Sequence, residues 1–218
     1  MYRYETHAHT SEVSSCGKVP AREAVRIYKN AGYAGMVITD HYYEGFFSGP
    51  GAWRDMAKRF LSGYHEAYDE ASRLDFDVIL GCEMRFTDHA NDYLVYGITE
   101  DFIMEHPMLH RMTPARFKLL AAESGLVIYQ AHPYRNGMSR AKPDHIDGVE
   151  VHNGNARHDS RNDRAKAFAA KHRLRELSGS DFHRHEDIAR GGIVLRERVS
   201  DSAAFARAIV VGDFNLII

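Results

Sequence analysis

Histidine is unusually frequent in this sequence: it accounts for 14 of the 218 residues, although it is not among the commonest residues of globular proteins. Histidine binds metal ions and transfers protons near neutral pH. His-x-His stands at 7–9, Asp-His at 40–41 and Asp-x-His at 181–183, and Glu83 and His132 lie apart from these pairs. Imidazole and carboxylate together suit Zn²⁺, Mn²⁺ or Fe²⁺, so these residues predict a metal centre.

Short β-rich segments and helical patterns alternate along the chain. We expect strands over residues 2–6, 35–39, 76–82, 92–97, 126–130 and 148–151, with 175–178 leading into the last motif. We expect helices over 20–30, 52–73, 114–124, 160–171 and 201–210. Successive β-then-α units predict a parallel sheet, open or closed into a barrel. No repeat or linker-like segment interrupts the chain, so residues 1–218 are expected to form one domain.

The histidines and carboxylates of interest lie at or beside the strand ends, which converge on one face of a (β/α) barrel. Alternation along a strand points both histidines of His-x-His to the same side, and Glu83 can bridge two cations through its two oxygens. Unpaired histidines and carboxylates buried there would cost several kcal/mol each without a cation. The expected cluster comprises His7, His9, Asp40, His41, Glu83, Asp92, His132, Asp181 and His183. Histidines in polar stretches, such as His110, are expected at the surface.

Composition argues against several protein classes. Lys and Arg total 28 and Asp and Glu total 30, so the net charge of −2 indicates neither a nucleic-acid partner nor a membrane surface. Cys16 and Cys82 are too few for a disulfide scaffold and favour a reduced, cytoplasmic setting. No apolar run approaches the roughly 18 residues that span a bilayer, and the N-terminus lacks the apolar region of a signal peptide. The oligomeric state is not readable from the sequence.

The order of the motifs resembles the polymerase and histidinol phosphatase (PHP) family of metal-dependent phosphoesterases. The matching segments are HAHT at 7–10, TDH at 39–41, Glu83, AHP at 131–133 and SDFH at 180–183. The resemblance implies a distorted (β/α)7 barrel, similar to a TIM barrel, with two or three divalent ions of zinc, manganese or iron.

The resemblance also implies a set of metal ligands. His7 and His9 would hold one ion with Glu83 and Asp181, Glu83 and His132 a second, and His41 and His183 a third. Glu83, His132 and Asp181 are therefore expected to be the catalytic residues.

Two positions depart from the common family pattern. The loop after HAHT lacks the usual Asp or His ligand, so Glu12 or Cys16 must substitute, and we favour Glu12 because a carboxylate matches the oxygen-rich site. The fourth strand opens with Asp92 where many members have His, and His89 is the alternative ligand. Both departures supply a side chain that can bind a metal.

The sequence thus predicts a phosphoesterase that hydrolyses a small phosphorylated metabolite, such as histidinol phosphate, a nucleotide or a sugar phosphate, by attack of a metal-bound hydroxide. Arg135, in the loop after His132, is expected to bind the phosphate, and Asn153 is a second substrate-binding candidate. The alternatives are a 3′–5′ exonuclease-like PHP domain, an amidohydrolase-type metal hydrolase and a non-catalytic metal-binding domain.

Overall fold

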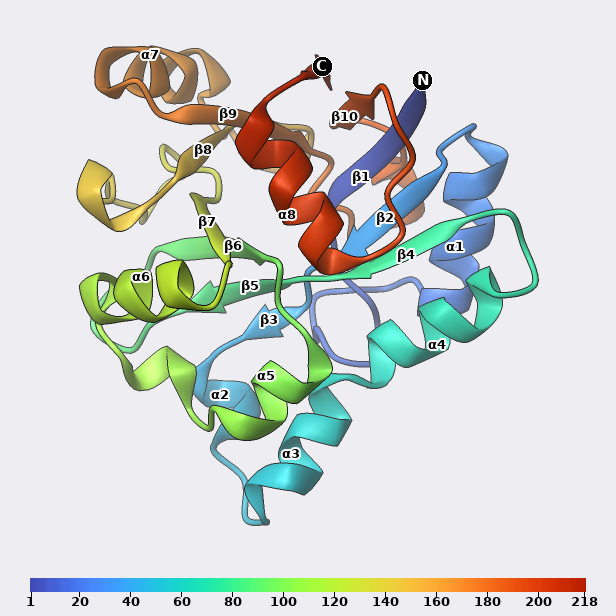
Figure 1. Ribbon diagram of the computed structural model, residues 1–218, viewed down its shortest axis with the longest axis horizontal. Coiled ribbons are helices and arrows are strands. Elements are labelled where there is room, and N and C mark those ends of the chain that lie inside the picture. The colour runs from blue at the N-terminus through green and yellow to red at the C-terminus, as the bar shows by residue number, and fades with distance from the viewer.

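The computed structural model describes residues 1–218 as a mixed α/β fold with two sheets (Figure 1). The first sheet has the strand order β11–β10–β1–β2–β4, and the second has the order β3–β5–β6–β7–β8–β9. The first sheet consists of β1 (Tyr2–Ala8), β2 (Gly35–Ile38), β4 (Asp77–Leu80), β10 (Gly192–Leu195) and β11 (Phe214–Ile217). The second consists of β3 (His41–Tyr42), β5 (Cys82–Arg85), β6 (Asp92–Tyr96), β7 (Val127–Gln130), β8 (Gly148–Asn153) and β9 (Arg175–Gly179).

The expectation of an all-parallel sheet is wrong for β6, β10 and β11. β6 runs antiparallel to both β5 and β7, and β10 runs antiparallel to β1 and β11. The segment 86–91 is too short for the crossover of about a dozen residues that a parallel β5–β6 pair would need. Asp92 opens β6 and pairs in register with Arg85 at the end of β5, so the reversal keeps Asp92 at the edge where β5 ends.

The two sheets are joined where the chain passes directly from one to the other. β2 leads into β3 and β4 leads into β5, with only Gly81 separating the latter pair. At the other edge of the second sheet, Ala8, the last residue of β1, forms a parallel bridge to Phe182, which follows β9. Strands of both sheets share one apolar core, in which Tyr4, Ile79 and Leu177 pack with Phe205 of α8. The sheets therefore enclose a common interior, although they are not one closed sheet.

Helices cover the outside of the sheets (Figure 1). The α-helices are α1 (Ala21–Asn30), α2 (Glu44–Phe47), α3 (Trp53–Phe60), α4 (Ser62–Ala71), α5 (Glu100–Glu105), α6 (Pro114–Glu123), α7 (Asn162–His172) and α8 (Ser202–Val211). None of them is long and apolar enough to traverse a bilayer.

The helix expected over 52–73 is two helices, because the chain turns between α3 and α4. Near this turn Gly63 presses against Thr10 and Asp40, where a Cβ atom would lie 2.2 Å from Thr10 Oγ1. Glycine also has a low helix propensity, which weakens a continuous helix here. The first turn of α4 thereby packs directly against the loop that follows β1.

Candidate metal centre

The end of β1 carries the first part of the site. His7 and His9 point to the same side of the strand and both are fully buried. Their Nε2 atoms lie 3.1 Å apart. The other ring nitrogens have separate partners, since His7 Nδ1 lies 2.8 Å from Glu150 Oε1 and His9 Nδ1 lies 3.2 Å from Ser14 Oγ. Both Nε2 atoms are thus aimed into one shared space.

Two buried carboxylates face that space. Glu83 Oε1 lies 3.4 Å from His7 Nε2, and Glu83 Oε2 lies 3.3 Å from His9 Nε2. Asp181 Oδ1 lies 3.5 Å from both of these nitrogens. Glu83 Oε1 also lies 3.0 Å from His132 Nε2. The structure therefore brings together five residues, namely His7 and His9 at the end of β1 and Glu83, His132 and Asp181 from distant segments.

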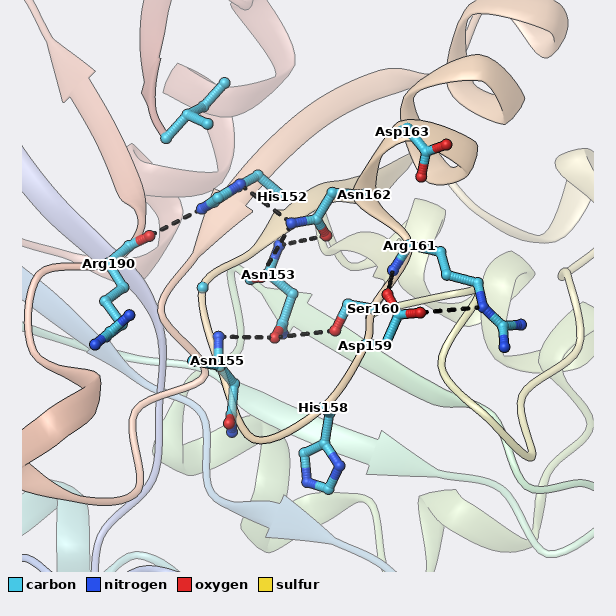
Figure 2. A pocket seen from close by; sticks show the side chains of 13 residues that line it. His152, Asn153, Asn155, His158, Asp159, Ser160, Arg161, Asn162, Asp163 and Arg190 are labelled. Atoms are coloured by element: carbon cyan, nitrogen blue, oxygen red, sulfur yellow. Dashed lines mark hydrogen bonds and ion pairs between the residues drawn. The ribbon is translucent and has the colours of Figure 1, made fainter.

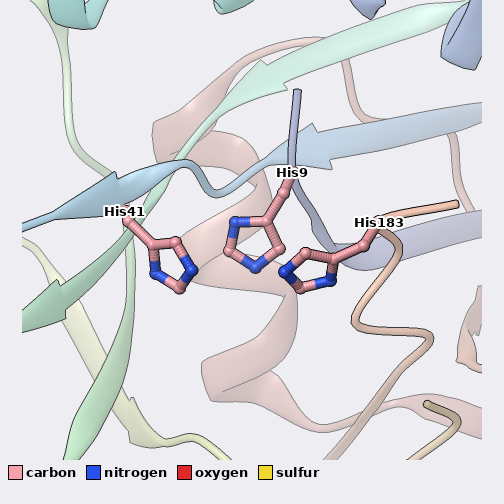
Figure 3. Close-up of side chains that lie close together, drawn as sticks. All are labelled: His9, His41 and His183. Atoms are coloured by element: carbon pink, nitrogen blue, oxygen red, sulfur yellow. The ribbon is translucent and has the colours of Figure 1, made fainter. Parts of the chain in front are cut away.

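His41 and His183 form the outer part of the cluster, with His9 between them (Figure 3). The ring centroid of His9 lies 4.3 Å from those of both His41 and His183. His41 Nδ1 lies 2.9 Å from Glu83 Oε2, which connects the outer part to the centre. Glu83 consequently contacts His7 and His132 through Oε1 and His9 and His41 through Oε2.

Two of the site residues adopt backbone conformations that residues other than glycine rarely take. His132 has φ of 27° and Asp181 has φ of 51°. Such conformations cost of order 1–3 kcal/mol and cluster at functional sites. The surroundings hold them in place, because the His132 backbone N–H donates to Glu150 Oε2 at 2.9 Å and the Phe182 backbone N–H donates to the His7 carbonyl at 3.0 Å.

The electrostatics of the cluster favour ionised carboxylates. Burial raises the pKa of Glu83, but the nearby His7 and His41 outweigh burial and hold this pKa well below its usual value. Burial lowers the pKa of His7, while the charges of Glu150, Asp181 and Glu83 raise it well above its usual value. Burial lowers the pKa of His9 well below its usual value, and the neighbouring His183 and His41 act in the same direction. The lowered pKa of Glu83 favours its ionised form, the raised pKa of His7 favours its protonated form, and the lowered pKa of His9 favours its neutral form.

The reasoning from sequence missed Glu150, which lies inside β8 and is 1% exposed. Its carboxylate accepts hydrogen bonds from the His132 backbone N–H at 2.9 Å and from Asn153 Nδ2 at 2.9 Å, in addition to its contact with His7 Nδ1. A carboxylate on the second nitrogen of a ligating histidine is common in metal sites and orients the ring. The signal in the sequence was a lone acidic residue between valines in a buried strand.

Glu12 does not lie at the cluster. Both of its carboxylate oxygens accept hydrogen bonds from the Ala21 backbone N–H, at 3.0 and 3.1 Å, at the start of α1. Cys16, the alternative, lies at the cluster: its Sγ is 3.2 Å from His41 Nε2 and 3.1 Å from His183 Nε2. The loop after β1 therefore directs Glu12 to the start of α1 and Cys16 to His41 and His183.

The two candidates at the start of β6 also separate. Asp92 lies within reach of Glu83 and His132, and Arg85 donates to both of its oxygens at 2.7 Å. His89 contacts Asp88 and the Tyr93 hydroxyl, and it belongs to none of the clusters. Asp92 is thus the one placed beside the centre.

Arg135 and Asn153 lie next to Asp181. Arg135 Nη2 donates to Asp181 Oδ2 at 2.6 Å and to Asn153 Oδ1 at 3.0 Å. The Arg135 side chain is 15% exposed, and its Nε is buried without a hydrogen-bond partner. Asn153 Nδ2 in turn donates to Glu150 Oε2. Asn153 therefore holds Arg135 with one end of its amide and Glu150 with the other.

A cavity of about 610 Å³ lies along the loop between β8 and α7 (Figure 2). Asn153 and Ser160, which contact Arg135, belong to its lining. The rest of the lining is also mostly polar and includes Asn155, whose Nδ2 lies 3.3 Å from the Asp181 carbonyl oxygen.

The donor set fits divalent cations. Neutral imidazole and ionised carboxylate are the ligands that zinc, manganese and iron take in proteins. Several overlapping triads have ligand atoms within 4.8 Å of one another, and three of these triads are fully buried. Cations bound there would compensate the buried carboxylates, which are otherwise costly to keep ionised.

Comparison with known proteins supports the recognition from motifs. The family model described as PHP domain matches residues 5–203. No curated protein sequence matches the chain. The family match agrees with the motif-based expectation of a PHP domain.

Solved structures with a similar fold share little sequence. A two-domain protein from Bacteroides vulgatus, described as containing a predicted PHP-like metal-dependent phosphoesterase, has a TM-score of 0.68 at 14% identity, covering 99% of this chain and 64% of its own. Endonuclease Q, bound to a 27-mer duplex with an abasic lesion, has a TM-score of 0.62 at 16% identity, covering 100% and 58%. An amidohydrolase from Chromobacterium violaceum has a TM-score of 0.54 at 16% identity, covering 84% and 89%.

These similarities concern the fold alone. The chain spans less than two thirds of the Bacteroides protein and of endonuclease Q.

Proposed function

This chain belongs to the PHP domain family, and we propose that it is a metal-dependent phosphoesterase that hydrolyses a small phosphorylated metabolite. The observation that carries this proposal is the position of Glu83 and Asp181, two buried carboxylates that face the Nε2 atoms of His7 and His9. Such a centre suits a reaction whose main demand is neutralisation of phosphoryl charge.

We propose that the centre holds two or three divalent ions of zinc, manganese or iron. The ligands of the inner positions are His7, His9, Glu83, Asp92, His132 and Asp181, and those of the outer position include His41 and His183. When bound, such ions lower the pKa of a coordinated water and draw charge from the phosphoryl oxygens. Glu12 is left out of this set because it bonds the start of α1.

Glu83, His132 and Asp181 are proposed as the residues nearest the reacting atoms. One carboxylate oxygen of Glu83 faces His7 and His132, and the other faces His9 and His41. This arrangement suits a carboxylate that bridges two ions. Asp181 directs Oδ1 to the histidines and Oδ2 to Arg135. A phosphate at the centre would therefore lie within reach of both the histidine cluster and the guanidinium group.

Arg135 is proposed to orient the phosphate. Its hydrogen bonds to Asp181 and Asn153 both come from Nη2, so the other guanidinium donors remain for substrate oxygens. A guanidinium fork matches phosphate oxygens in charge and geometry. Asn153 is proposed to position Arg135, because both ends of its amide already have protein partners.

We further infer that the two sheets form a distorted barrel of the kind the family resemblance implies. The bridge between Ala8 and Phe182 and the core shared by both sheets support this inference. In such a barrel the residues that follow β1 and β9 lie together at one end, as His9 and His183 do.

The proposal is tested by turnover on a substrate panel. Purified protein loaded with Mn²⁺, Zn²⁺ or Fe²⁺ is assayed on histidinol phosphate, nucleotides, sugar phosphates, oligonucleotides and amides. We expect hydrolysis of a small phosphomonoester that stops when metal is removed and returns when it is added back. Turnover confined to oligonucleotides would favour an exonuclease-like PHP domain, and turnover of amides an amidohydrolase. Full phosphatase activity in protein shown by elemental analysis to be metal-free would contradict the mechanism.

A further inference from the structure

A thiol lies at the outer end of the metal centre. Cys16 Sγ is 3.2 Å from His41 Nε2 and 3.1 Å from His183 Nε2, so it sits between the two rings. The three residues come from separate parts of the chain: the loop after β1, strand β3 and the segment after β9. Their meeting is thus a product of the fold and not of local sequence.

Both histidines are oriented so that Nε2 faces the sulfur. His41 Nδ1 lies 2.9 Å from Glu83 Oε2, and His183 Nδ1 lies 2.9 Å from the Asp181 carbonyl oxygen. Ligating histidines usually donate their second N–H to a carboxylate or a backbone carbonyl, which fixes the other nitrogen as the ligand atom. The Nε2 atoms of two imidazoles therefore face one sulfur.

The two nitrogen–sulfur separations are close to those of a tetrahedral zinc site. With zinc–nitrogen distances of about 2.0–2.1 Å and a zinc–sulfur distance of about 2.3 Å, the nitrogen and sulfur ligands lie about 3.6 Å apart. The observed separations of 3.1 and 3.2 Å are shorter by about half an ångström, a difference that small side-chain rotations absorb.

We propose that Cys16 is a thiolate ligand of a cation held by Nε2 of His41 and His183, and that it gives this position a preference for zinc over manganese. Thiolate is a soft ligand that selects zinc, whereas sites of carboxylate and water suit manganese. This inference rests on the metal centre of the proposed function. It assigns to Cys16 the place in the cluster that the sequence favoured for Glu12.

The position is open to solvent on one side. A cavity of about 170 Å³ lies in front of Cys16 and His41 and is completed by Ser15, Tyr43 and Arg85. Cys16 is exposed, whereas Cys82, the other cysteine, is fully buried. A metal ion and a small alkylating reagent can therefore both reach Cys16, and Cys82 provides an unreactive internal reference.

Cobalt spectroscopy tests the assignment directly. Metal-free wild-type protein, Cys16→Ser and the control Glu12→Gln are each titrated with Co²⁺ alone. We expect the near-ultraviolet thiolate-to-cobalt charge-transfer band in the wild type and in Glu12→Gln, and its loss in Cys16→Ser together with weaker binding at one position. A band that persists in Cys16→Ser, or that is absent from the wild type, would overturn the proposal.

A second measurement needs no variant and so does not depend on folding of Cys16→Ser. Alkylation of the wild type by iodoacetamide is followed by mass spectrometry with and without Zn²⁺. We expect Zn²⁺ to slow modification of Cys16 by roughly tenfold or more, because a bound thiolate is a poor nucleophile. An unchanged rate would overturn the proposal. Neither negative result would contradict the proposed phosphoesterase function. That proposal is contradicted only if the substrate panel shows no metal-dependent phosphate release.

Discussion

The protein buries histidine in two very different places. In the metal centre His7 contacts three carboxylates, those of Glu83, Glu150 and Asp181. Beneath α2, His110 is equally buried but stacks on the Phe47 ring at a centroid distance of 5.4 Å and an interplanar angle of 10°. Its Nε2 contacts only Glu44, at 2.8 Å.

The difference shows what distinguishes the surroundings of His7, in the proposed metal centre, from those of His110. Burial lowers the pKa of His110, and the single Glu44 does not reverse that effect. At His7 three carboxylates outweigh burial and raise the pKa. An unpartnered buried nitrogen does not distinguish the regions either, because both His110 Nδ1 and His132 Nδ1 lack a partner. Convergence of several ionisable groups from different strand ends is what separates the two.

The proposed difference between the two regions is tested most strongly by removing one histidine from each. His7→Ala should lower kcat/KM by about 10³-fold or more, since it deletes a ligand whose ion must stabilise the transition state. Bound metal, measured by elemental analysis, should fall as well. His110→Ala should destabilise folding by about 2 kcal/mol in chemical denaturation, through a lost contact and a cavity, and leave metal content unchanged. A loss of bound metal in His110→Ala would contradict the distinction between the two regions.

Arg135→Ala sharpens the comparison by separating substrate binding from metal binding. We expect kcat/KM to fall roughly 10²-fold, about 2.7 kcal/mol, with metal content nearly unchanged. Arg135→Lys should recover only part of the activity, because an ammonium keeps the charge and loses the fork. Arg140→Ala, in the same loop and exposed, is the matched control and should retain wild-type kinetics. Wild-type kcat/KM in Arg135→Ala would return Arg135 to a structural role.

Glu150→Gln tests whether the carboxylate behind His7 belongs to the centre. The amide keeps the size of the side chain but cannot accept all of the hydrogen bonds that reach the carboxylate, so His7 loses its orienting charge. Metal affinity, measured by competition with a chelator, should weaken roughly 10–100-fold. Glu176→Gln on the neighbouring strand β9 removes the same charge and should leave affinity unchanged. Equal affinities in the two variants would make Glu150 a folding residue only.

The smallest expected effect concerns Glu12. Glu12→Gln should leave the metal content unchanged. It should lower folding stability by about 1 kcal/mol or less, because it only weakens the hydrogen bonds to the Ala21 backbone at the start of α1. Elemental analysis and a denaturant titration measure the two quantities. A loss of bound metal would restore Glu12 to the ligand set.

The order of strands and motifs was largely predictable because it depends on local signals. Alternating apolar segments ending in His-x-His or Asp-x-His place the candidate ligands at strand ends, and in the structure His7, His9 and Asp181 lie within 3.5 Å of one another. The position of His110 was not predictable in this way. Its segment was interpreted as polar and exposed, although Leu109 precedes it directly. The 3-10 turn that contains it packs against Phe47 and Tyr42 from a distant segment.

By itself the sequence determined which side chains are candidates for the proposed metal centre, because alternation along a strand and the position of each strand end place His7, His9, Glu83 and Asp181 at strand ends. Only the tertiary structure decided between Glu12 and Cys16, since both lie in one loop whose path depends on the packing of α1 and α4 against β1. It also decided the role of Glu150, which reaches His7 only because β8 and β1 enclose the same interior. Contacts between distant strands follow from packing, and no periodicity within one segment encodes them.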